Sequence, residues 1–214
     1  MKTKILLLAL LGVFSSLNLS SQSLRAGINL ANFIDKNDTA LFHPLYDADF
    51  GFHFGAEVDL DLSPLFSLET GLNITTRGCK LAWSDSGFTA TARTVLYYIT
   101  LPVSGKMYVP VSVNFKPFVS FGPYVGVAIL GKIKAKATKG TQSGEGEDNI
   151  SFSDGGLLKR YDYGLQMSGG MQIARKVELG AYYDLGLANI SSNTQNGTLV
   201  QNRVLRFSVK LFLD

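Results

Sequence analysis

The fold is decided by the stretch 49-DFGFHFGAEVDLDL-62, in which every even position is apolar and every odd position is polar, charged or glycine. Successive side chains of a β-strand point to opposite faces, so the stretch predicts a strand with one apolar and one polar face. Strands of soluble sheets usually have about 5 to 6 residues, whereas a tilted strand that crosses a bilayer needs about 9 to 11. A run of fourteen residues therefore favours a strand that spans an outer membrane.

The same alternation recurs along the chain in seven further segments. They cover residues 22–33, 67–78, 95–109, 118–130, 161–173, 177–188 and 204–213. Together with the first stretch they make eight strands. An even number is what closed bacterial up-and-down barrels require.

The links between these segments alternate in length. Three are short, at residues 63–66, 110–117 and 174–176, and four are long, at residues 34–48, 79–94, 131–160 and 189–203. In outer-membrane barrels the periplasmic turns are short and the extracellular loops are long. The alternation therefore predicts that both termini lie in the periplasm. It also predicts that the Gly-, Lys- and Glu-rich residues 132–156 form a loop within a single domain.

A soluble lipocalin-like barrel shows the same alternation turned inside out, so side-chain volume has to decide which face points outward. The apolar faces carry most of the Phe, Leu, Val and Ile, whereas the polar faces are rich in glycine, including Gly51, Gly55, Gly122 and Gly164. A narrow lumen favours small residues mixed with polar ones, while lipid accepts bulky hydrocarbon. The sequence thus predicts an all-β fold, an eight-stranded antiparallel up-and-down transmembrane β-barrel with a side-chain-filled lumen.

The N-terminus has the layout of a secretory signal peptide. Lys2 and Lys4 precede an apolar run at residues 5–14 and a small, polar stretch, with cleavage expected near Ser21. The run is too short to cross a membrane as a helix, and it lacks the polar positions of the alternative, an N-terminal helix buried in the fold. We therefore expect residues 1–21 to be removed on export and residues 22–214 to form one barrel domain in the cell outer membrane.

Charge and cysteine content exclude other classes of protein. Removal of the leader takes away two of the 20 Lys+Arg and none of the 17 Asp+Glu, which leaves a net charge of +1 and no reason to expect a nucleic-acid partner. The single cysteine, Cys79, rules out an intramolecular disulfide. Because no Cys-His signature accompanies it, we expect Cys79 to be an ordinary residue near a strand end.

With the polar faces inward, charges of both signs enter a lumen in which an unpaired charge is costly. We expect them to pair into a plug rather than to line a pore. The predicted lumen network consists of Arg25, His53, Glu57, Glu69, Arg77, Lys106, Tyr124, Asp162, Asp184 and Arg206. Asp59, Asp61, Glu178 and Lys210 also belong to polar faces, but they lie near the periplasmic rim, where we expect hydration.

Aromatic residues gather near the strand ends of the apolar faces. Phe50, Phe52, Tyr97, Tyr161 and Tyr163 lie toward the long links, and Phe66 and Phe121 lie toward the short ones. Membrane barrels carry aromatic girdles at both interfaces. The sequence therefore predicts two girdles made of these residues.

No pattern in the chain indicates a catalytic, cofactor or metal site. His53 and Glu57 share one face of a strand but lie about 13 Å apart along its axis, beyond hydrogen-bond reach, so we expect a hydrogen-bonding role for His53 in the lumen. Two isolated histidines, His43 and His53, make no zinc motif. The acidic residues of the long fifth link could hold a calcium ion by their charge, but they do not fit the spacing of an EF-hand, so a solvated loop is favoured. They are Glu145, Glu147, Asp148 and Asp154.

Three lysines, Lys132, Lys134 and Lys136, alternate directly after the segment 118–130. There they either contact anionic lipopolysaccharide or extend the strand into solvent. The pattern alone leaves both interpretations open.

Several blocks of the chain resemble the PorT-like family of bacterial outer-membrane β-barrels. They include LRAGINLANF (24–33), FGFHFGAEVDLDLSPLFSLETGLNITTRG (50–78), YYITLPVSGKMYV (97–109) and YDYGLQMSGGMQI (161–173). The resemblance implies an eight-stranded barrel in a Gram-negative outer membrane and brings no catalytic residues with it. One member of that family is associated with protein secretion across the envelope. Many outer-membrane barrels end in an aromatic residue, whereas this chain ends in Phe212, Leu213 and Asp214.

The sequence therefore favours a small non-enzymatic barrel. It would act structurally or contact other envelope or secretion components through its loops or its periplasmic rim, and its other neighbours would be outer-membrane lipids and lipopolysaccharide. An enzyme that modifies outer-membrane lipids is the alternative, for which the loops offer only His43 near acidic residues such as Asp47 and Asp49. A passive small-solute pore is disfavoured, because side chains fill the interior of an eight-stranded barrel.

Overall fold

The computed structural model describes residues 21–35, 47–85, 88–112, 114–139, 142–152, 156–192 and 199–213, which form nine β-strands in one sheet. Their bounds are β1 Ser21–Asp35, β2 Asp49–Ser63, β3 Phe66–Asp85, β4 Phe88–Tyr108, β5 Phe115–Lys139, β6 Gln142–Asn149, β7 Tyr161–Ile173, β8 Val177–Gly186 and β9 Val200–Phe212. The expected leader up to residue 20, His43 and Asp154 lie outside the described residues. Within the described ranges no helix has the length and apolar character needed to cross a bilayer.

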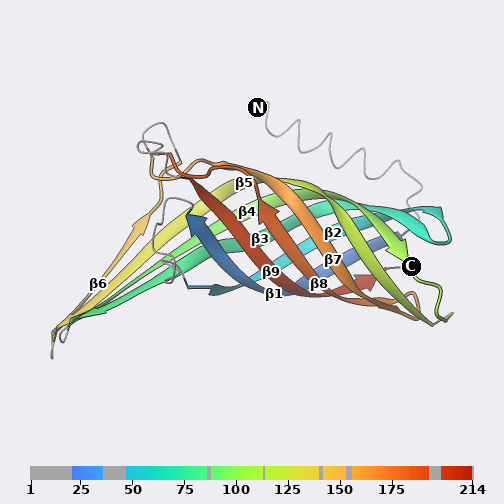
Figure 1. Cartoon of the computed structure of the whole chain (residues 1–214), viewed down its shortest axis with the longest axis horizontal. Helices are drawn as coiled ribbons and strands as arrows, with labels where there is room; N and C mark the ends of the chain where they lie inside the picture. Colours follow the sequence, from blue (N-terminus) through green and yellow to red (C-terminus); the bar gives the residue numbers. More distant parts are fainter. Residues whose placement is uncertain are drawn as a thin grey trace.

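Eight of the strands close into a ring (Figure 1). The order is β4-β3-β2-β1-β9-β8-β7-β5, and a further pairing between β4 and β5 joins the two ends. All pairings around the ring are antiparallel. The predicted all-β, eight-stranded antiparallel barrel is therefore confirmed. The ninth strand, β6, pairs antiparallel with the end of β5 outside the ring.

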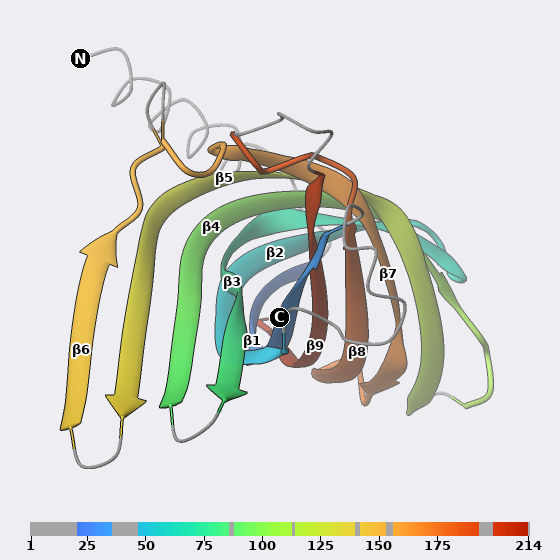
Figure 2. The same ribbon diagram turned by 60° about the vertical axis from the view of Figure 1, so that its left-hand side comes forward.

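Three ring strands continue past the barrel and form, together with β6, a four-stranded extension that we call the projecting sheet (Figure 2). It comprises residues 80–85 of β3, 88–94 of β4, 132–139 of β5 and all of β6. It lies at the end of the barrel opposite the C-terminus (Figure 1). The prediction that 79–94 and 132–156 are loops is thus wrong for the paired residues of both segments.

The polar residues of the projecting sheet follow the alternating pattern of a β-strand. Lys132, Lys134 and Lys136 alternate with apolar Ile133, Ala135 and Ala137, as strand residues do. A sheet with solvent near both faces needs no bulky apolar face, so hydrophobicity gives little signal there. The three lysines do extend β5, as one of the two interpretations predicts, and the contact with lipopolysaccharide stays a prediction.

A β-bulge marks the place where the projecting sheet leaves the barrel. Tyr97 pairs with Leu130 and Tyr98 pairs with Ala128, so β5 has one extra residue, Ile129. Bulges bend a strand and increase its twist, and they are common at barrel rims. The bulge therefore redirects β4 and β5 away from the wall of the ring.

Short turns connect the strands at the opposite end, as predicted. In the turn from β2 to β3, Ser63 Oγ accepts hydrogen bonds from the backbone N–H groups of Leu65, at 3.3 Å, and Phe66, at 3.1 Å. The turn from β7 to β8 contains Ala174 and Arg175, whose φ angles are 49° and 56°. Both residues adopt the left-handed conformation that a tight hairpin needs.

The two faces of the ring differ in the predicted sense. On β2, Phe50, Phe52 and Phe54 point outward and are 53 to 59% exposed, whereas Glu57 points inward and is 2% exposed. Of the proposed girdle residues, Tyr97 is half-buried and its ring packs edge-on against Phe52, with 6.3 Å between centroids. The other proposed girdle residues are exposed on the outer face, namely Phe50, Phe52, Phe66, Phe121, Tyr161 and Tyr163.

Two glycines of β7 allow a test of which face is packed. A Cβ added at Gly164 would lie 2.1 Å from the carbonyl oxygen of Leu185, whereas at Gly169 its nearest neighbour would be 3.7 Å away. We expect Gly164→Ala to lower the free energy of unfolding by about 1 to 3 kcal/mol, the usual cost of overpacking. Gly169→Ala should change it by no more than about 0.5 kcal/mol. Urea unfolding in detergent micelles measures both values, and equal tolerance would show that the faces are assigned wrongly.

Candidate functional site

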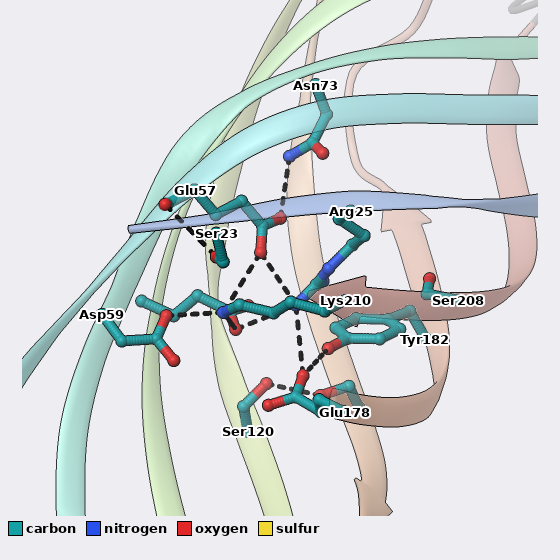
Figure 3. A network of polar contacts seen from close by, with 12 residues as sticks. Ser23, Arg25, Glu57, Asp59, Asn73, Ser120, Glu178, Tyr182, Ser208 and Lys210 are labelled. Carbon is teal, nitrogen blue, oxygen red and sulfur yellow. Dashed lines mark hydrogen bonds and ion pairs between the residues drawn. The ribbon is translucent and has the colours of Figure 1, made fainter. Parts of the chain in front are cut away.

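The part of the lumen nearest the short turns contains a network of ion pairs that we call the turn-side cluster (Figure 3). Its members are Arg25, Glu57, Asp59, Glu69, Lys106, Glu178, Tyr182 and Lys210, all at most 2% exposed. They come from β1, β2, β3, β4, β8 and β9, strands whose inward-facing positions meet at this level. The cluster therefore joins strands that lie far apart in the sequence.

Glu69 is the centre of the turn-side cluster. Its Oε2 atom lies 2.9 Å from Arg25 Nη2, 2.5 Å from Lys106 Nζ and 2.9 Å from Lys210 Nζ. Asp59 sits directly opposite Glu69 in the β2–β3 pairing, an arrangement of like charges that is unfavourable by itself. The two lysines resolve the repulsion, because Lys106 and Lys210 also approach Asp59, at 3.3 and 2.6 Å.

The remaining carboxylates of the cluster share the same cations. Glu57 lies 2.9 Å from Arg25, and Glu178 lies 3.3 Å from Arg25 and 2.8 Å from Lys106. Tyr182 donates a hydrogen bond of 2.8 Å to Glu178, and its ring lies under the Arg25 guanidinium, 4.1 Å away. Four carboxylates thus face three cations, so the cluster has an excess of one acidic group.

A second network, the loop-side cluster, fills the lumen closer to the projecting sheet. Arg77 pairs with Asp162 and with Asp184, the latter at 3.2 Å, and donates a hydrogen bond of 2.9 Å to Tyr124. Arg206 pairs with Asp184 at 2.8 Å. Two guanidinium groups and two carboxylates balance in charge, and bidentate Arg chemistry suits such buried pairs.

His53 lies between the two clusters and contacts Asn29 and Ser208. The Asn29 amide nitrogen donates to the backbone carbonyls of Phe52 and Thr76, at 2.9 and 3.0 Å, so its oxygen faces His53. His53 Nδ1 lies 2.6 Å from that oxygen and must be the donor, which leaves Nε2 to accept from Ser208 Oγ at 2.8 Å. The three residues therefore form a serine–histidine–asparagine chain, and a hydrogen-bonding role for His53 is what the structure shows.

Apolar side chains close the lumen above the loop-side cluster. The apolar cap consists of Phe33, Cys79, Leu96, Tyr98, Ala128, Ile150, Ala188, Ile190 and Val200, all less than 9% exposed. Cys79 is a free thiol within it. The interior thus changes from charged to apolar toward the projecting sheet, which leaves it packed at that end.

All ten residues of the predicted lumen network are buried in the interior, at most 2% exposed. His53 lies between the turn-side cluster and the loop-side cluster, and each of the other nine residues belongs to one of these clusters. The expected hydration of Asp59, Glu178 and Lys210 is wrong, since they are at most 1% exposed. In the turn-side cluster Glu178 pairs with Lys106, and Asp59 pairs with Lys210. Asp61 is exposed, as expected. Sequence reasoning missed Asn29, Ser208 and Tyr182, whose inward strand positions were the available signal.

One group of carboxylates has the spacing of a metal site. Asp59, Glu69 and Glu178 each place an oxygen within 4.8 Å of the others. Lys106 lies within 3.3 Å of all three, so an ammonium group already supplies the positive charge that a cation would bring. The chemistry of this donor set is therefore that of an ion-pair network rather than a metal centre.

The projecting sheet carries exposed ion pairs between β5 and β6. Glu147 lies 2.6 Å from Lys132 and 3.0 Å from Lys134, and Glu145 lies 2.6 Å from Lys136. Hydrogen bonds from Lys132 and Lys134 lower the pKa of Glu147, and the hydrogen bond from Lys136 lowers the pKa of Glu145. The five residues of these pairs thus hold β6 against β5.

A closed antiparallel ring with an apolar exterior and a packed, charged interior defines the class of membrane-spanning β-barrels. Residues 15–192 match the family model described as outer membrane protein beta-barrel domain. The chain therefore belongs to this family, whose place is the outer membrane. A search of curated proteins finds no match in sequence.

Solved structures of similar shape come from several bacteria. Neisserial surface protein A has 15% identity and a TM-score of 0.45, with 89% of this chain and 96% of that chain covered. Ail, the attachment invasion locus protein of Yersinia pestis, has 11% identity and a TM-score of 0.39, with 90% and 98% covered. The outer membrane protease OmpT from Escherichia coli has 11% identity and a TM-score of 0.39, with 92% and 98% covered.

The central position of Glu69 leads to a stability prediction. Glu69→Gln leaves three carboxylates for three cations but removes the oxygen at which all three cations meet, and it should lower the free energy of unfolding by about 1.5 to 3 kcal/mol, the range for hydrogen bonds to charged groups. Glu57→Gln is the matched control, because it removes the excess acidic group and keeps the oxygen that accepts from Asn73. Glu57→Gln should lower the free energy of unfolding clearly less than Glu69→Gln does. Urea unfolding of both variants in micelles tests this, and equal losses would contradict the central role of Glu69.

The ion pairs of β6 predict a dependence on pH. A carboxylate whose pKa is lowered by folding adds stability above its unfolded pKa of about 4.3, and that stability is lost as the pH falls through its folded pKa. Amide hydrogen exchange of β6, corrected for its intrinsic pH dependence, should therefore accelerate under acidic conditions while β9 stays protected. Glu145→Gln/Glu147→Gln should exchange faster already at neutral pH. Unchanged protection in that variant would show that the pairs do not hold β6.

Proposed function

We propose that this protein is a non-enzymatic outer-membrane barrel of the PorT-like kind, which contacts other envelope or secretion components through its projecting sheet. The observation that carries the proposal is the combination of a packed lumen with a sheet that extends beyond the barrel. A lumen filled by two charged clusters and an apolar cap leaves the interior no evident transport path. Contacts with other envelope components would then be made by the surfaces that project from the barrel.

The projecting sheet offers a surface suited to such contacts. All eight residues of β6 are exposed, and its outer edge is that of an edge strand. Edge strands present backbone N–H and C=O groups to which another chain can add. Near the tip, Trp83 is 56% exposed and packs edge-on against Phe88, with 5.6 Å between ring centroids. Exposed Trp is enriched in protein interfaces.

The proposed orientation places both termini and the short turns in the periplasm, with the projecting sheet outside the cell. It is supported by the length rule for barrel turns, since the turns at the terminus-bearing end are short. Ser143→Cys on β6 and Lys176→Cys in a short turn test it, because native Cys79 is buried and should label poorly. A membrane-impermeant maleimide should label Ser143→Cys on intact cells and Lys176→Cys only after the outer membrane is permeabilised. The opposite pattern would reverse the orientation.

The contact role itself is tested by photo-crosslinking in native cells. A photoreactive residue at Ser143 or at Trp83 should give a discrete adduct with an envelope protein, whereas the same residue at outward-facing Val125, which is 54% exposed on the barrel wall, should not. Adducts of equal yield at Val125 would contradict a specific role for the projecting sheet.

A second candidate function is hydrolysis of an ester in an outer-membrane lipid. It is favoured by the chain Ser208–His53–Asn29, in which a nucleophile, a base and an orienting amide lie at 2.8 and 2.6 Å. Against it, Ser208 and His53 are 6% and 2% exposed and lie between the two charged clusters, where a lipid has no evident access.

A fluorophosphonate probe decides between the two functions. The non-enzymatic proposal predicts that the probe labels neither the folded wild-type protein nor the Ser208→Ala variant. Labelling of the folded barrel that disappears in Ser208→Ala and in His53→Gln would instead establish the hydrolase.

A further inference from the structure

The wall of the barrel has a local opening between β2 and β3. The backbone pairing of the two strands ends at His53 and Thr75, and it resumes at the bridge between Asp47 and Lys80. In the interval, Thr76 Oγ1 accepts from the Phe52 N–H at 2.8 Å and donates to the Phe52 carbonyl at 3.0 Å. A side chain thus replaces the missing backbone ladder and holds the strands apart.

This opening forms a depression of about 330 Å³, which we call the β2–β3 notch. Its membrane side is apolar, with Ile28, Phe50, Phe52 and Tyr97. Three of these side chains are 45 to 59% exposed on the outer face, namely Ile28, Phe50 and Phe52. The notch is therefore continuous with the surface that faces the acyl chains of the membrane.

The side of the notch toward the projecting sheet is cationic. Arg93, Lys132 and Lys134 line it, and their side chains are 45, 45 and 53% exposed. Arg93 pairs directly with Lys134 across β4 and β5, and Lys132 lies two residues from Lys134, so the three side chains share one face. It is the outer face, because Tyr97, four residues from Arg93 on β4, packs against outward-facing Phe52. Arg93 and Lys134 face each other directly with like charge, and Lys132 lies beside them, an arrangement that is unfavourable unless anions accompany it.

The protein supplies only part of the neutralising charge. Asp49 lies 2.7 Å from Arg93, and Glu147 lies 2.6 Å from Lys132 and 3.0 Å from Lys134. Two carboxylates thus serve three cations in an exposed setting, in which such pairs exchange readily. A phosphate group brings more negative charge than a single carboxylate and suits the planar fork of Arg93.

We propose that the β2–β3 notch binds the phosphate-bearing headgroup of an outer-leaflet lipid. The phosphate contacts Arg93, Lys132 and Lys134, and the acyl chains lie along the outer face below Phe50 and Phe52. Aromatic side chains at the headgroup level and cations directly beyond them form the order that such an amphipathic ligand requires. The inference rests on the proposed orientation, which places this end of the barrel at the outer leaflet.

The test uses the purified full-length mature barrel in detergent micelles and measures retention of bisphosphorylated lipid A by native mass spectrometry. The variant Arg93→Gln/Lys132→Gln/Lys134→Gln should bind it at least tenfold more weakly. The control Lys139→Gln/Lys159→Gln/Lys176→Gln removes the same charge from exposed sites outside the notch and should bind as the wild type does. Glu147→Gln should bind more tightly, because it removes the carboxylate that competes for two of the cations. Mobility of the unheated protein on SDS gels verifies that each variant is folded.

Lipid A without phosphates should bind as weakly to the wild type as to the notch variant, and millimolar inorganic phosphate should not displace the intact lipid. Equal loss in the two triple variants, or equal binding of the dephosphorylated lipid, would overturn the phosphate site. Displacement by inorganic phosphate would overturn the lipid assignment. Because the measurement uses purified protein, failed crosslinks in cells leave its result unchanged, so failure of the proposed function and failure of the lipid site are distinguishable.

Discussion

Pairing of buried charge is the constraint on which the rest of the structure depends. An eight-stranded barrel is too narrow for a water-filled interior, so each inward charge must find a partner among the side chains of other strands. Glu69 satisfies this by meeting Arg25, Lys106 and Lys210 at one oxygen atom. These contacts bridge residues as far as 141 positions apart, and they fix which strands face one another across the lumen.

The same constraint explains what the sequence could and could not predict. Strand alternation predicted the ring and placed residues such as Arg77 and Asp184 inside it, because the period of two is a local property. The sequence does not show which charges pair with one another. Asp59 and Glu69 face each other with like charge, and only lysines of distant strands make this arrangement favourable. The contact of His53 with Ser208 joins residues 155 positions apart and has no local signal.

The strands of the projecting sheet have no comparable signal in the sequence, for a different physical reason. The polarity of residues 132–156 predicts a loop even though the lysines at its start alternate with apolar residues, and β6 is rich in glycine and acidic residues. Lys132 and Glu147 show what stabilises such a strand, namely cross-strand pairs between exposed side chains. The interior of the barrel is thus specified by burial, whereas its projecting sheet is specified by pairing between exposed side chains.

A packed plug of paired charges in the lumen should block the passage of ions, and the conductance of the purified barrel in a planar lipid bilayer measures this. We predict no steady open current for the wild type, because two ion-pair clusters and an apolar cap occupy the interior. A variant that removes the Arg77 and Arg206 side chains, Arg77→Ala/Arg206→Ala, should conduct more if it remains folded. A large, steady open-channel current in the wild-type protein would contradict the account.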